Sequence, residues 1–413
     1  MNVVVRHAGV LVTCAGDWRP RAGAAAHDLG IVTDGAVVME RGRIVWVGRD
    51  TDVPAGLPDS PEVDAARRLV TPGLVDCHTH ALFAGSRAGE FAMRVCGSTY
   101  EEIMAQGGGI SASARMLREA PDADILEQTA GRLWRMLRFG TTTCEIKSGY
   151  GLSTEQEVRS LRLIQQLRSR VPIRVVPTFL GAHAIPPEWR YDREGFVRQV
   201  TEEMIPQVAR EELARFCDVF CEHGAFSVEE SRRILETARA HGMDLKIHAD
   251  ELASSGGTRL GAELGVCSAD HLLCATRGDL EALRDSGAIA VMLPGTCLGL
   301  AKTRYAPGRL MAEIGLPVAV ASDLNPGNCY CENLPLMVTL ACLYGGLSLE
   351  QALVGVTINA AHALRLGDEV GSLEPGKRGD LVIWECDDYR DIAYHFGVQL
   401  ASIVIAGGVV AAP

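Results

Sequence analysis

From residue 69 onward, short apolar runs rich in Val, Ile and Thr alternate with stretches of helical periodicity. The run Thr141–Lys147, for example, is followed by the helical stretch Thr154–Arg170. A later stretch, Arg277–Ser286, places apolar Leu280 and Leu283 at helical spacing beside charged positions. This alternation is typical of βα units and predicts a parallel sheet.

Eight segments have the length and composition of such strands. They are Leu69–Cys77, Thr141–Lys147, Ile173–Leu180, Asp218–Glu222, Asp244–His248, Ser268–Leu273, Ala288–Leu293 and Pro317–Ser322. Eight strands with helices between them, over about 300 residues, predict a TIM-like (β/α)8 barrel. An open doubly wound sheet is the alternative, but no Gly-x-Gly-x-x-Gly follows the first strand. The glycines 107–109 follow no strand, and we expect them to form a loop.

Both ends of the chain have a different pattern, with strands and turns but no long helical period. Gly35–Glu40 and Arg43–Gly48 flank a two-residue turn, which predicts a hairpin. After residue 366 strand-like runs return, beginning with Asp380–Trp384. We therefore predict a small β-sandwich domain built from both chain termini, residues 1–68 and 367–413, and a barrel of residues 69–366.

Composition and charge narrow the possible partners and the compartment. The chain has 413 residues, of which 47% are hydrophobic, enough for a large core and a smaller second one. Its net charge of −12 argues against nucleic acid or an anionic membrane as a partner. The thirteen cysteines form no Cys-x-x-Cys pair and no signal peptide precedes them, so we expect a reducing, cytoplasmic location. No apolar run approaches the roughly 18–20 residues that span a bilayer.

Metal-ligating side chains fall where the predicted strands end, which is where barrel enzymes carry their catalytic groups. The first strand ends in His78 and His80, and alternate residues of a strand point the same way. The fifth strand ends in His248, the sixth contains His271, and Asp323 follows the eighth. Four histidines and a carboxylate at equivalent places predict a metal centre.

The ligand types indicate the chemistry of that centre. Neutral imidazole suits zinc, iron, nickel or copper better than magnesium or calcium. Three histidines and an aspartate can hold one divalent ion and leave a position for water, whose pKa the ion lowers toward neutrality. His271 is then a fourth nitrogen ligand or an orienter of the water, and Asp323 is a ligand, a proton acceptor or both. Glu251 follows the fifth strand and can carry a proton to a leaving nitrogen.

Other candidate ligands are less suited to this role. A second ion would need a bridging carboxylate at the end of the fourth strand, where Glu222 stands, and we expect a single ion. Lys147 ends the second strand, where we expect it to bind an anion or to pack structurally. The cysteine pairs 217/221 and 329/331 are alternative ligands, although buried thiols usually pack as small hydrophobes.

Several segments resemble the amidohydrolase superfamily and, within it, the imidazolonepropionase family. The superfamily resemblance rests on Thr71–His80 with His248, His271 and Asp323, and on the C-terminal segments Asn359–Leu364 and Gly371–Ile383. The resemblance to the narrower family rests on His78–Arg87, Glu145–Leu152, Phe179–Pro186, His248–Glu251 and Asp323–Asn328. Together these segments are specific, whereas His-x-His alone would indicate only the superfamily.

The resemblance implies hydrolysis of 4-imidazolone-5-propanoate to N-formimino-L-glutamate, the third step of histidine degradation, by a homodimer. It implies one Zn2+ or Fe3+ ion per subunit, held by His78, His80, His248 and Asp323, with catalytic roles for Glu251, His271 and Asp323. The implied substrate contacts are Arg87, Tyr150, His183, Glu251, Asn325, Gly327 and Asn328. Asn328 stands where some members have a small hydroxyl residue, so its contact departs from their pattern.

The residue types agree with that substrate, and each also has a simpler explanation. Arg87 can hold a propionate carboxylate with two hydrogen bonds, or it is a surface arginine. Tyr150 and His183 follow the second and third strands, where they can donate to substrate oxygens or pack in loops. Two other functions remain open. One is a different cyclic amidase or a nucleobase or amino-heterocycle deaminase of the superfamily. The other is a non-catalytic scaffold, which would be expected to have lost metal ligands that this chain retains.

Overall fold

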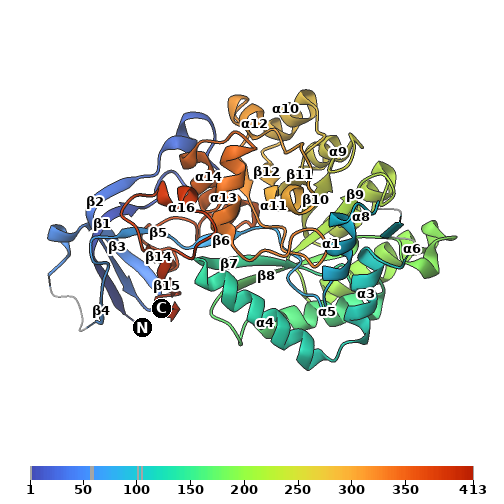
Figure 1. Ribbon diagram of the computed structural model, residues 1–413, viewed down its shortest axis with the longest axis horizontal. Coiled ribbons are helices and arrows are strands. Elements are labelled where there is room, and N and C mark those ends of the chain that lie inside the picture. The colour runs from blue at the N-terminus through green and yellow to red at the C-terminus, as the bar shows by residue number, and fades with distance from the viewer. Residues whose placement is uncertain (1, 56–59, 100–101, 104–105, 413) are drawn as a thin grey trace.

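The computed structural model describes residues 2–55, 60–99, 102–103 and 106–412. Two eight-stranded sheets organise it, one at each side of Figure 1. The larger part is a barrel whose strands follow one another in sequence order, β6 to β13. The other sheet joins the first and last strands of the chain.

All neighbouring barrel strands pair in parallel. The strands are β6 (Leu74–Asp76), β7 (Thr141–Lys147), β8 (Arg174–Ala182), β9 (Phe216–Cys221), β10 (Asp244–Ala249), β11 (Ser268–His271), β12 (Ile289–Met292) and β13 (Val318–Val320). A parallel bridge between Thr79 and Leu324, just beyond β6 and β13, connects the first strand with the last. The predicted TIM-like barrel is confirmed.

Amphipathic helices cover the outside of the barrel, and their sequences account for where they begin. Ser227 caps α8 (Val228–Ala240) in a reciprocal capping box with Glu230. The hydroxyl of Ser153 caps α5 (Thr154–Leu167). In α10 (Arg277–Asp285) the predicted inner-face leucines, 280 and 283, have no exposed surface. The glycines 107–109 precede α3 (Ile110–Glu119) and form the predicted loop.

The remaining α-helices complete this layer and the loops above the barrel. They are α1 (Ala88–Val95), α4 (Asp122–Arg138), α6 (Arg193–Arg198), α7 (Ile205–Arg210), α9 (Gly257–Leu264), α11 (Pro294–Gly299), α12 (Gly308–Glu313), α13 (Leu334–Leu343), α14 (Leu349–Gly355), α15 (Ile358–Ala363) and α16 (Asp391–Tyr394). Short 3-10 turns lie at Gly23–His27, Asp50–Asp52 and Pro187–Trp189, and a π-helical turn at Gln199–Met204. Among the described residues, no helix combines the length and the apolar composition needed to cross a membrane.

The second sheet brings both chain ends together, as the sequence predicts (Figure 1). Its strands are β1 (Val3–Val12), β2 (Ile31–Glu40), β3 (Arg43–Arg49), β4 (Glu62–Asp64), β5 (Leu69–Pro72), β14 (Leu381–Trp384), β15 (Ala401–Ala406) and β16 (Val409–Ala412). Their order is β16-β15-β14-β5-β1-β2-β3, with β4 on β1. The predicted hairpin is the antiparallel pair β2–β3.

The predicted strand Leu69–Cys77 is in fact two strands in different sheets. β5 pairs with β1 and β14, whereas β6 pairs with β7 in the barrel. Gly73 separates them, and a Cβ there would lie 2.2 Å from Oγ1 of Thr142, so only glycine lets the chain cross at this point. Both halves are fully buried, so hydrophobicity alone could not reveal the break. We propose that the domain formed by the two termini meets the barrel at Gly73.

Candidate active site

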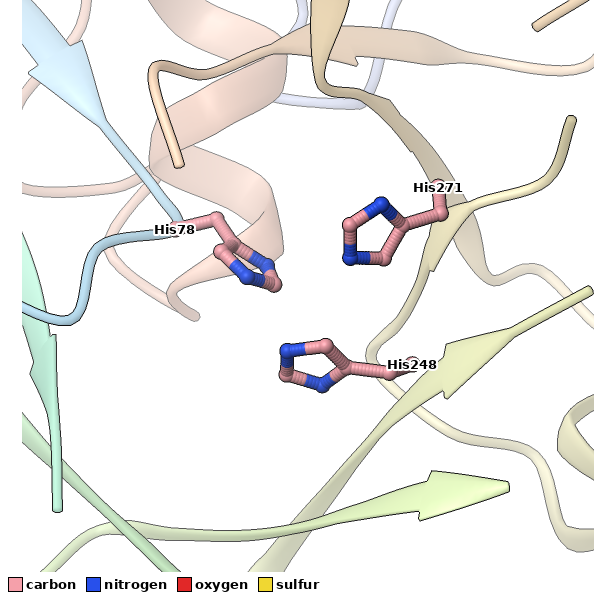
Figure 2. A group of neighbouring side chains, drawn as sticks. All are labelled: His78, His248 and His271. Atoms are coloured by element: carbon pink, nitrogen blue, oxygen red, sulfur yellow. The ribbon is translucent and has the colours of Figure 1, made fainter. Parts of the chain in front are cut away.

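Five potential ligands converge at the carboxyl end of the barrel. His78 and His80 follow β6, His248 lies in β10, His271 ends β11 and Asp323 follows β13. Two groups among them, one of which is drawn in Figure 2, have ligand atoms that all lie within 4.8 Å of one another. The groups are His78, His248 and His271, and His78, His80 and Asp323. All five side chains are buried.

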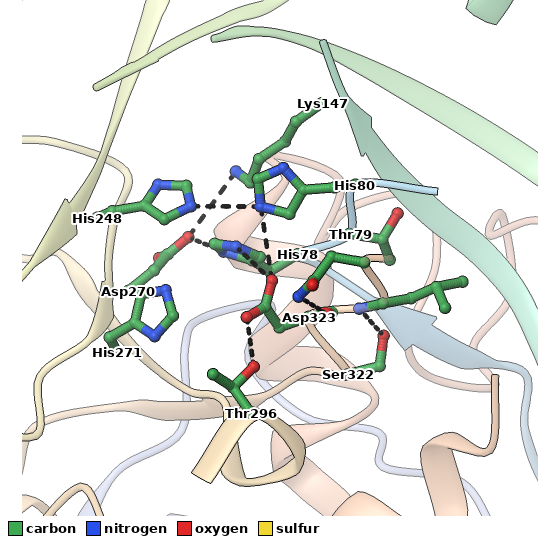
Figure 3. A network of polar contacts seen from close by, with 12 residues as sticks. His78, Thr79, His80, Lys147, His248, Asp270, His271, Thr296, Ser322 and Asp323 are labelled. Atoms are coloured by element: carbon green, nitrogen blue, oxygen red, sulfur yellow. Dashed lines mark hydrogen bonds and ion pairs between the residues drawn. The ribbon is translucent and has the colours of Figure 1, made fainter. Parts of the chain in front are cut away.

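The facing atoms are nitrogens and a carboxylate oxygen. Oδ1 of Asp323 lies 3.5 Å from Nε2 of His78 and 3.5 Å from Nε2 of His80. Nε2 of His80 is also 3.4 Å from Nε2 of His248 (Figure 3). Within the described part of the chain, Nε2 of His78 is buried and has no hydrogen-bond partner. Such a lone pair is costly to bury unless a cation or a donor meets it.

The opposite ring nitrogens face buried carboxylates. Nδ1–H of His78 donates to Oδ2 of Asp270 at 2.6 Å, and Nδ1 of His248 lies 3.0 Å from Oδ2 of Asp218. A proton held at Nδ1 leaves Nε2 as a bare lone pair, the form that ligates a metal. The donor set and its tautomers therefore fit a zinc or iron ion.

The backbone at these strand ends adopts the left-handed region, which residues other than glycine rarely occupy. The φ angle is 76° at His271, 52° at Asp323 and 51° at Asp250. Each such residue costs on the order of 1–3 kcal/mol and persists only where its surroundings hold it. The backbone N–H of Asp323 donates to the carbonyl of His78 at 3.0 Å, and the Thr296 hydroxyl donates to its Oδ2 at 2.5 Å.

Burial sets the charge states of the histidines. It lowers the pKa of His78 and of His80 well below the usual value, and neighbouring cationic groups lower it further. Burial also lowers the pKa of His183 to about 3. At His248 burial again lowers the pKa, but the nearby Asp218 carboxylate more than offsets it, so the net shift is upward. His78 and His80 are thus held in the neutral form that can ligate a metal.

Glu251 lies beside the ligands. Its Oε2 is 3.6 Å from Nε2 of His271 and its Oε1 is 3.7 Å from Nζ of Lys302. Asp250, next to it, folds this loop by accepting hydrogen bonds from the backbone N–H groups of Ser255 and Gly256. Glu251 is thereby presented between a histidine and a lysine, without being part of either ligand group.

Arg87 meets the turn of residues 325–328. A Cβ on Gly327 would lie 2.2 Å from Nη1 of Arg87, so the guanidinium packs directly on that glycine. Nη2 donates to Glu90 at 2.7 Å, while Nε is buried and has no partner among the described residues. A cavity of about 470 Å3 adjoins these groups, and Arg87, Gly327 and Asn328 line part of it. This arrangement leaves donors of Arg87 for an anionic ligand.

Two other predicted contact residues border the ligand cluster. The ring of His183 stacks on His80 with centroids 5.0 Å apart, and the ring of Tyr150 lies 5.3 Å from His183. Nδ1–H of His183 donates to the Gly149 carbonyl at 3.0 Å, which leaves its Nε2 as an acceptor. Burial raises the pKa of Tyr150, so its hydroxyl keeps its proton.

The side chain of Asn325 is occupied by the chain itself. Its Oδ1 accepts from the backbone N–H groups of Gly327 and Asn328, and its Nδ2 donates to the Asp323 carbonyl. Asn325 therefore shapes the turn that faces Arg87.

Glu222 and Lys147 have partners that the sequence does not identify. The carboxylate of Glu222 accepts backbone N–H groups of His223 and Leu252, and it belongs to neither ligand group found among the described residues. Lys147 is fully buried between acidic side chains, which include Asp218 at 2.7 Å. A separate cavity of about 800 Å3, lined by Arg174 and Met243 among others, lies at the amino end of the strands, away from the ligands.

Sequence reasoning missed the residues that support the site. Asp218, Asp270, Thr296 and Lys302 each contact a candidate residue, yet no motif marks them. The available signal was a charged residue inside an otherwise buried strand, as for Asp218 and Asp270.

Three comparisons place the chain among known proteins. The model of the amidohydrolase family matches residues 69–410. An imidazolonepropionase from Geobacillus kaustophilus is 47% identical over 409 residues, which are 98% of this chain and 96% of that protein. An imidazolonepropionase from Symbiobacterium thermophilum is 48% identical over 412 residues, covering 99% and 96% of the two chains.

A solved structure agrees with the fold. The crystal structure of an adenosine deaminase from Xanthomonas campestris with bound zinc superposes with a TM-score of 0.74 at 19% identity. The match covers 99% of this chain and 92% of that one. At this identity the likeness concerns the fold alone.

Proposed function

This chain belongs to the amidohydrolase family and, within it, to the imidazolonepropionases, and on that premise we propose that it hydrolyses 4-imidazolone-5-propanoate to N-formimino-L-glutamate. The reaction adds water to the ring carbonyl carbon, breaks the ring C–N bond and moves a proton to the departing nitrogen. The observation that carries the proposal is the cluster of His78, His80, His248 and Asp323 at the end of the barrel. Arg87 packs on Gly327, four residues beyond Asp323.

We propose that His78, His80, His248 and Asp323 hold one Zn2+ or Fe3+ ion per subunit. The unpartnered Nε2 of His78, and the Asp323 oxygen that faces both His78 and His80, support this set. His271 forms a ligand group with His78 and His248, and its Nε2 also lies 3.6 Å from Glu251, so we assign it a role in charge stabilisation. An ion bound there supplies a Lewis acid that lowers the pKa of water and polarises a carbonyl. Both carboxylate oxygens of Glu222 accept hydrogen bonds from backbone N–H groups, so this residue is not free to bridge a second ion, which supports a single-ion site.

The chain's own residues orient the substrate. Arg87 binds the propionate carboxylate through its unpaired donors, and Gly327 leaves room for the guanidinium beside the turn. Tyr150 donates its hydroxyl to a substrate oxygen, and His183 accepts a ring N–H at its free Nε2. Asn325 accepts the backbone N–H groups of Gly327 and Asn328 and so holds the turn on which the guanidinium of Arg87 packs.

Two carboxylates and a histidine handle protons and charge. Asp323 or Glu251 accepts the proton of the attacking water at a carboxylate oxygen. His271 stabilises the negative charge that develops on the carbonyl oxygen. Glu251 then delivers to the departing ring nitrogen the proton taken from the water, either directly or after Asp323 has passed it to Glu251. Its position supports this role, because its carboxylate oxygens lie 3.6 Å from Nε2 of His271 and 3.7 Å from Nζ of Lys302, beside the ligand cluster.

Incubation of the purified protein with 4-imidazolone-5-propanoate tests the proposal. Ring opening to N-formimino-L-glutamate without release of ammonia is expected. Release of ammonia from an amino-heterocycle, with no ring opening, would instead indicate a deaminase of the same family. Metal content well below about one ion per chain would favour a scaffold without catalysis.

We further propose that the protein is a homodimer and works in the cytoplasm. Leu343 ends α13 and Tyr344 follows it, while Tyr394 ends α16 and Phe396 lies just beyond it. The exposed fractions of these four residues are 69%, 57%, 81% and 62%. α13 contacts α16, so these side chains lie on neighbouring elements, and an apolar surface of this kind is typical of an interface. None of the thirteen cysteines is in a disulfide, which fits a reducing compartment. Sedimentation of Phe396→Asp, expected to give monomers, tests the interface.

A further inference from the structure

A network of five charged side chains lies directly beneath the candidate metal ligands. Its members are Glu145 and Lys147 of β7, Asp218 of β9, Lys246 of β10 and Asp270 of β11, and none has any exposed surface. Residues 145 and 147 are two apart in one strand, so both point into the barrel. Charges at this depth persist only when partners compensate them closely.

Lys147 is in contact with all three acidic members. Its Nζ lies 2.7 Å from Oδ2 of Asp218, 2.8 Å from Oε2 of Glu145 and 3.9 Å from Oδ2 of Asp270. Burial by itself would lower the pKa of Lys147, but the three carboxylates raise it above its usual value. The lysine is therefore a permanent cation inside the barrel.

Two of the carboxylate oxygens that face Lys147 also face a candidate ligand histidine. Oδ2 of Asp218 lies 3.0 Å from Nδ1 of His248, and Oδ2 of Asp270 accepts from Nδ1 of His78 at 2.6 Å. In Figure 3 the dashed lines from Lys147 and from His78 meet at the same Asp270 oxygen. One cation thus stands behind two of the four proposed metal ligands.

The second lysine has a different orientation. Nζ of Lys246 donates to Oε1 of Glu145 at 2.9 Å and to the Cys77 carbonyl at 2.8 Å. It lies 4.0 Å from Oδ2 of Asp270, nearly the 3.9 Å that separates Lys147 from the same oxygen. The two lysines therefore differ in the 2.7 Å contact of Lys147 with Asp218. Glu145 in turn contacts both lysines and Thr178, but neither histidine. Glu145 is therefore as buried as Lys147 and is also ion-paired, but it contacts none of the proposed metal-ligating histidines.

We propose that Lys147 is a positioning residue of the candidate metal centre. It donates to the Asp218 carboxylate that faces Nδ1 of His248, and at 3.9 Å it faces the Asp270 carboxylate that accepts from His78. The inference rests on the proposed function, because it presupposes a metal at these histidines. Without Lys147, Oδ2 of Asp218 keeps His248 as its remaining side-chain partner, and the pocket keeps three carboxylates with one lysine. The carboxylates then shift toward other donors and the imidazoles lose their fixed orientation.

The effect is measurable as metal affinity. Changes to groups that orient metal-ligating histidines typically weaken binding about 10–100-fold. We would measure the Kd for Zn2+ by chelator competition on metal-free wild-type protein, Lys147→Met, Lys147→Gln and Glu145→Gln, with the thermal midpoint of each. Glu145→Gln is the matched control, since it disrupts the same buried network without touching an acceptor of a histidine.

The expected result is a Kd raised about 10–100-fold in Lys147→Met, an intermediate value in Lys147→Gln, which keeps an N–H donor, and a Kd within about threefold of wild type in Glu145→Gln. Wild-type affinity in Lys147→Met, or an equal loss in Glu145→Gln, would overturn the proposal. If Lys147→Met does not fold, the Kd for Zn2+ of Lys147→Gln is compared with that of Glu145→Gln. A Kd in Lys147→Gln no higher than in Glu145→Gln would then overturn the proposal. A wild-type protein that binds no Zn2+ or iron would instead refute the proposed function.

Discussion

The Nδ1–H of His78 and the Oδ2 of Asp270 form a 2.6 Å hydrogen bond between two side chains with no exposed surface. The bond assigns the proton to Nδ1 and directs the lone pair of Nε2 toward Asp323 and the other ligands. Asp270 is thus a supporting residue of the proposed metal centre, because it orients His78.

Replacement of this acceptor is therefore expected to weaken metal binding. Asp270→Asn keeps the size of the side chain but removes the charge, and we expect a Kd for Zn2+ raised about 10–100-fold. Chelator competition measures it. Asp380→Asn is the control, because Asp380 is also buried and ion-paired, with Arg378, but precedes β14 in the sheet of the termini. Equal affinity in both variants would show that Asp270 does not orient a ligand.

The proton-transfer role of Glu251 predicts a loss confined to turnover. Glu251→Gln keeps the shape of the side chain but cannot accept a proton, so we expect kcat to fall about 10²–10⁴-fold. The metal content should remain that of wild type, because Glu251 is in neither ligand group. Steady-state kinetics with elemental analysis checks both, and Glu263→Gln, on the exposed side of α9, serves as the control. A Glu251→Gln enzyme with its metal and full turnover would exclude the role.

The sequence identified the candidate ligands that the fold brings together, but not the buried residues that contact them. The periodicity of apolar residues and the predicted strand ends located His78, His248 and Asp323, because each of these residues stands at the end of its own apolar run. The partner of His78 lies 192 residues further along the chain, on a strand whose alignment with β6 only the closed barrel defines. A carboxylate inside a buried strand reveals that it needs a partner, but not which one. The sequence also did not predict that Leu69–Cys77 divides into two strands. Strands that are fully buried in either sheet have the same apolar composition, so hydrophobicity does not distinguish them.

Removal of the proposed carboxylate anchor should act on substrate binding. If Arg87 holds the propionate equally in ground and transition states, Arg87→Ala raises KM, by about tenfold or more for a lost charged hydrogen bond, and leaves kcat nearly unchanged. Arg115→Ala provides the control, because Arg115 is exposed on α3. Unchanged KM in Arg87→Ala would contradict the assignment.

The close packing of Arg87 on Gly327 gives an independent test of the same anchor. In Gly327→Ala the new Cβ would lie 2.2 Å from Nη1 of Arg87, so the guanidinium must move. We expect KM to rise in the same direction as in Arg87→Ala, without a change in metal content. Gly89→Ala is the matched control, because a Cβ there meets nothing within 4 Å. A KM that stays at the wild-type value in Gly327→Ala would mean that this position of Arg87 is not the one that binds substrate.

The substrate side of the site also shows what spacing can and cannot predict. Arg87 and Glu90 are three apart on a helical turn, so their 2.7 Å pair follows from local geometry. The approach of Arg87 to Gly327 joins loops 240 residues apart in sequence and depends on how both leave the barrel. Such contacts arise from the fold and become visible only with it.

The account is tested most directly by following 4-imidazolone-5-propanoate by mass spectrometry with the purified protein, before and after metal removal by a chelator. The predicted result is conversion to N-formimino-L-glutamate without ammonia, loss of conversion in the metal-free protein, and recovery when Zn2+ or iron is returned. Conversion that persists in the metal-free protein, or none in a protein loaded with about one ion per chain, would contradict it.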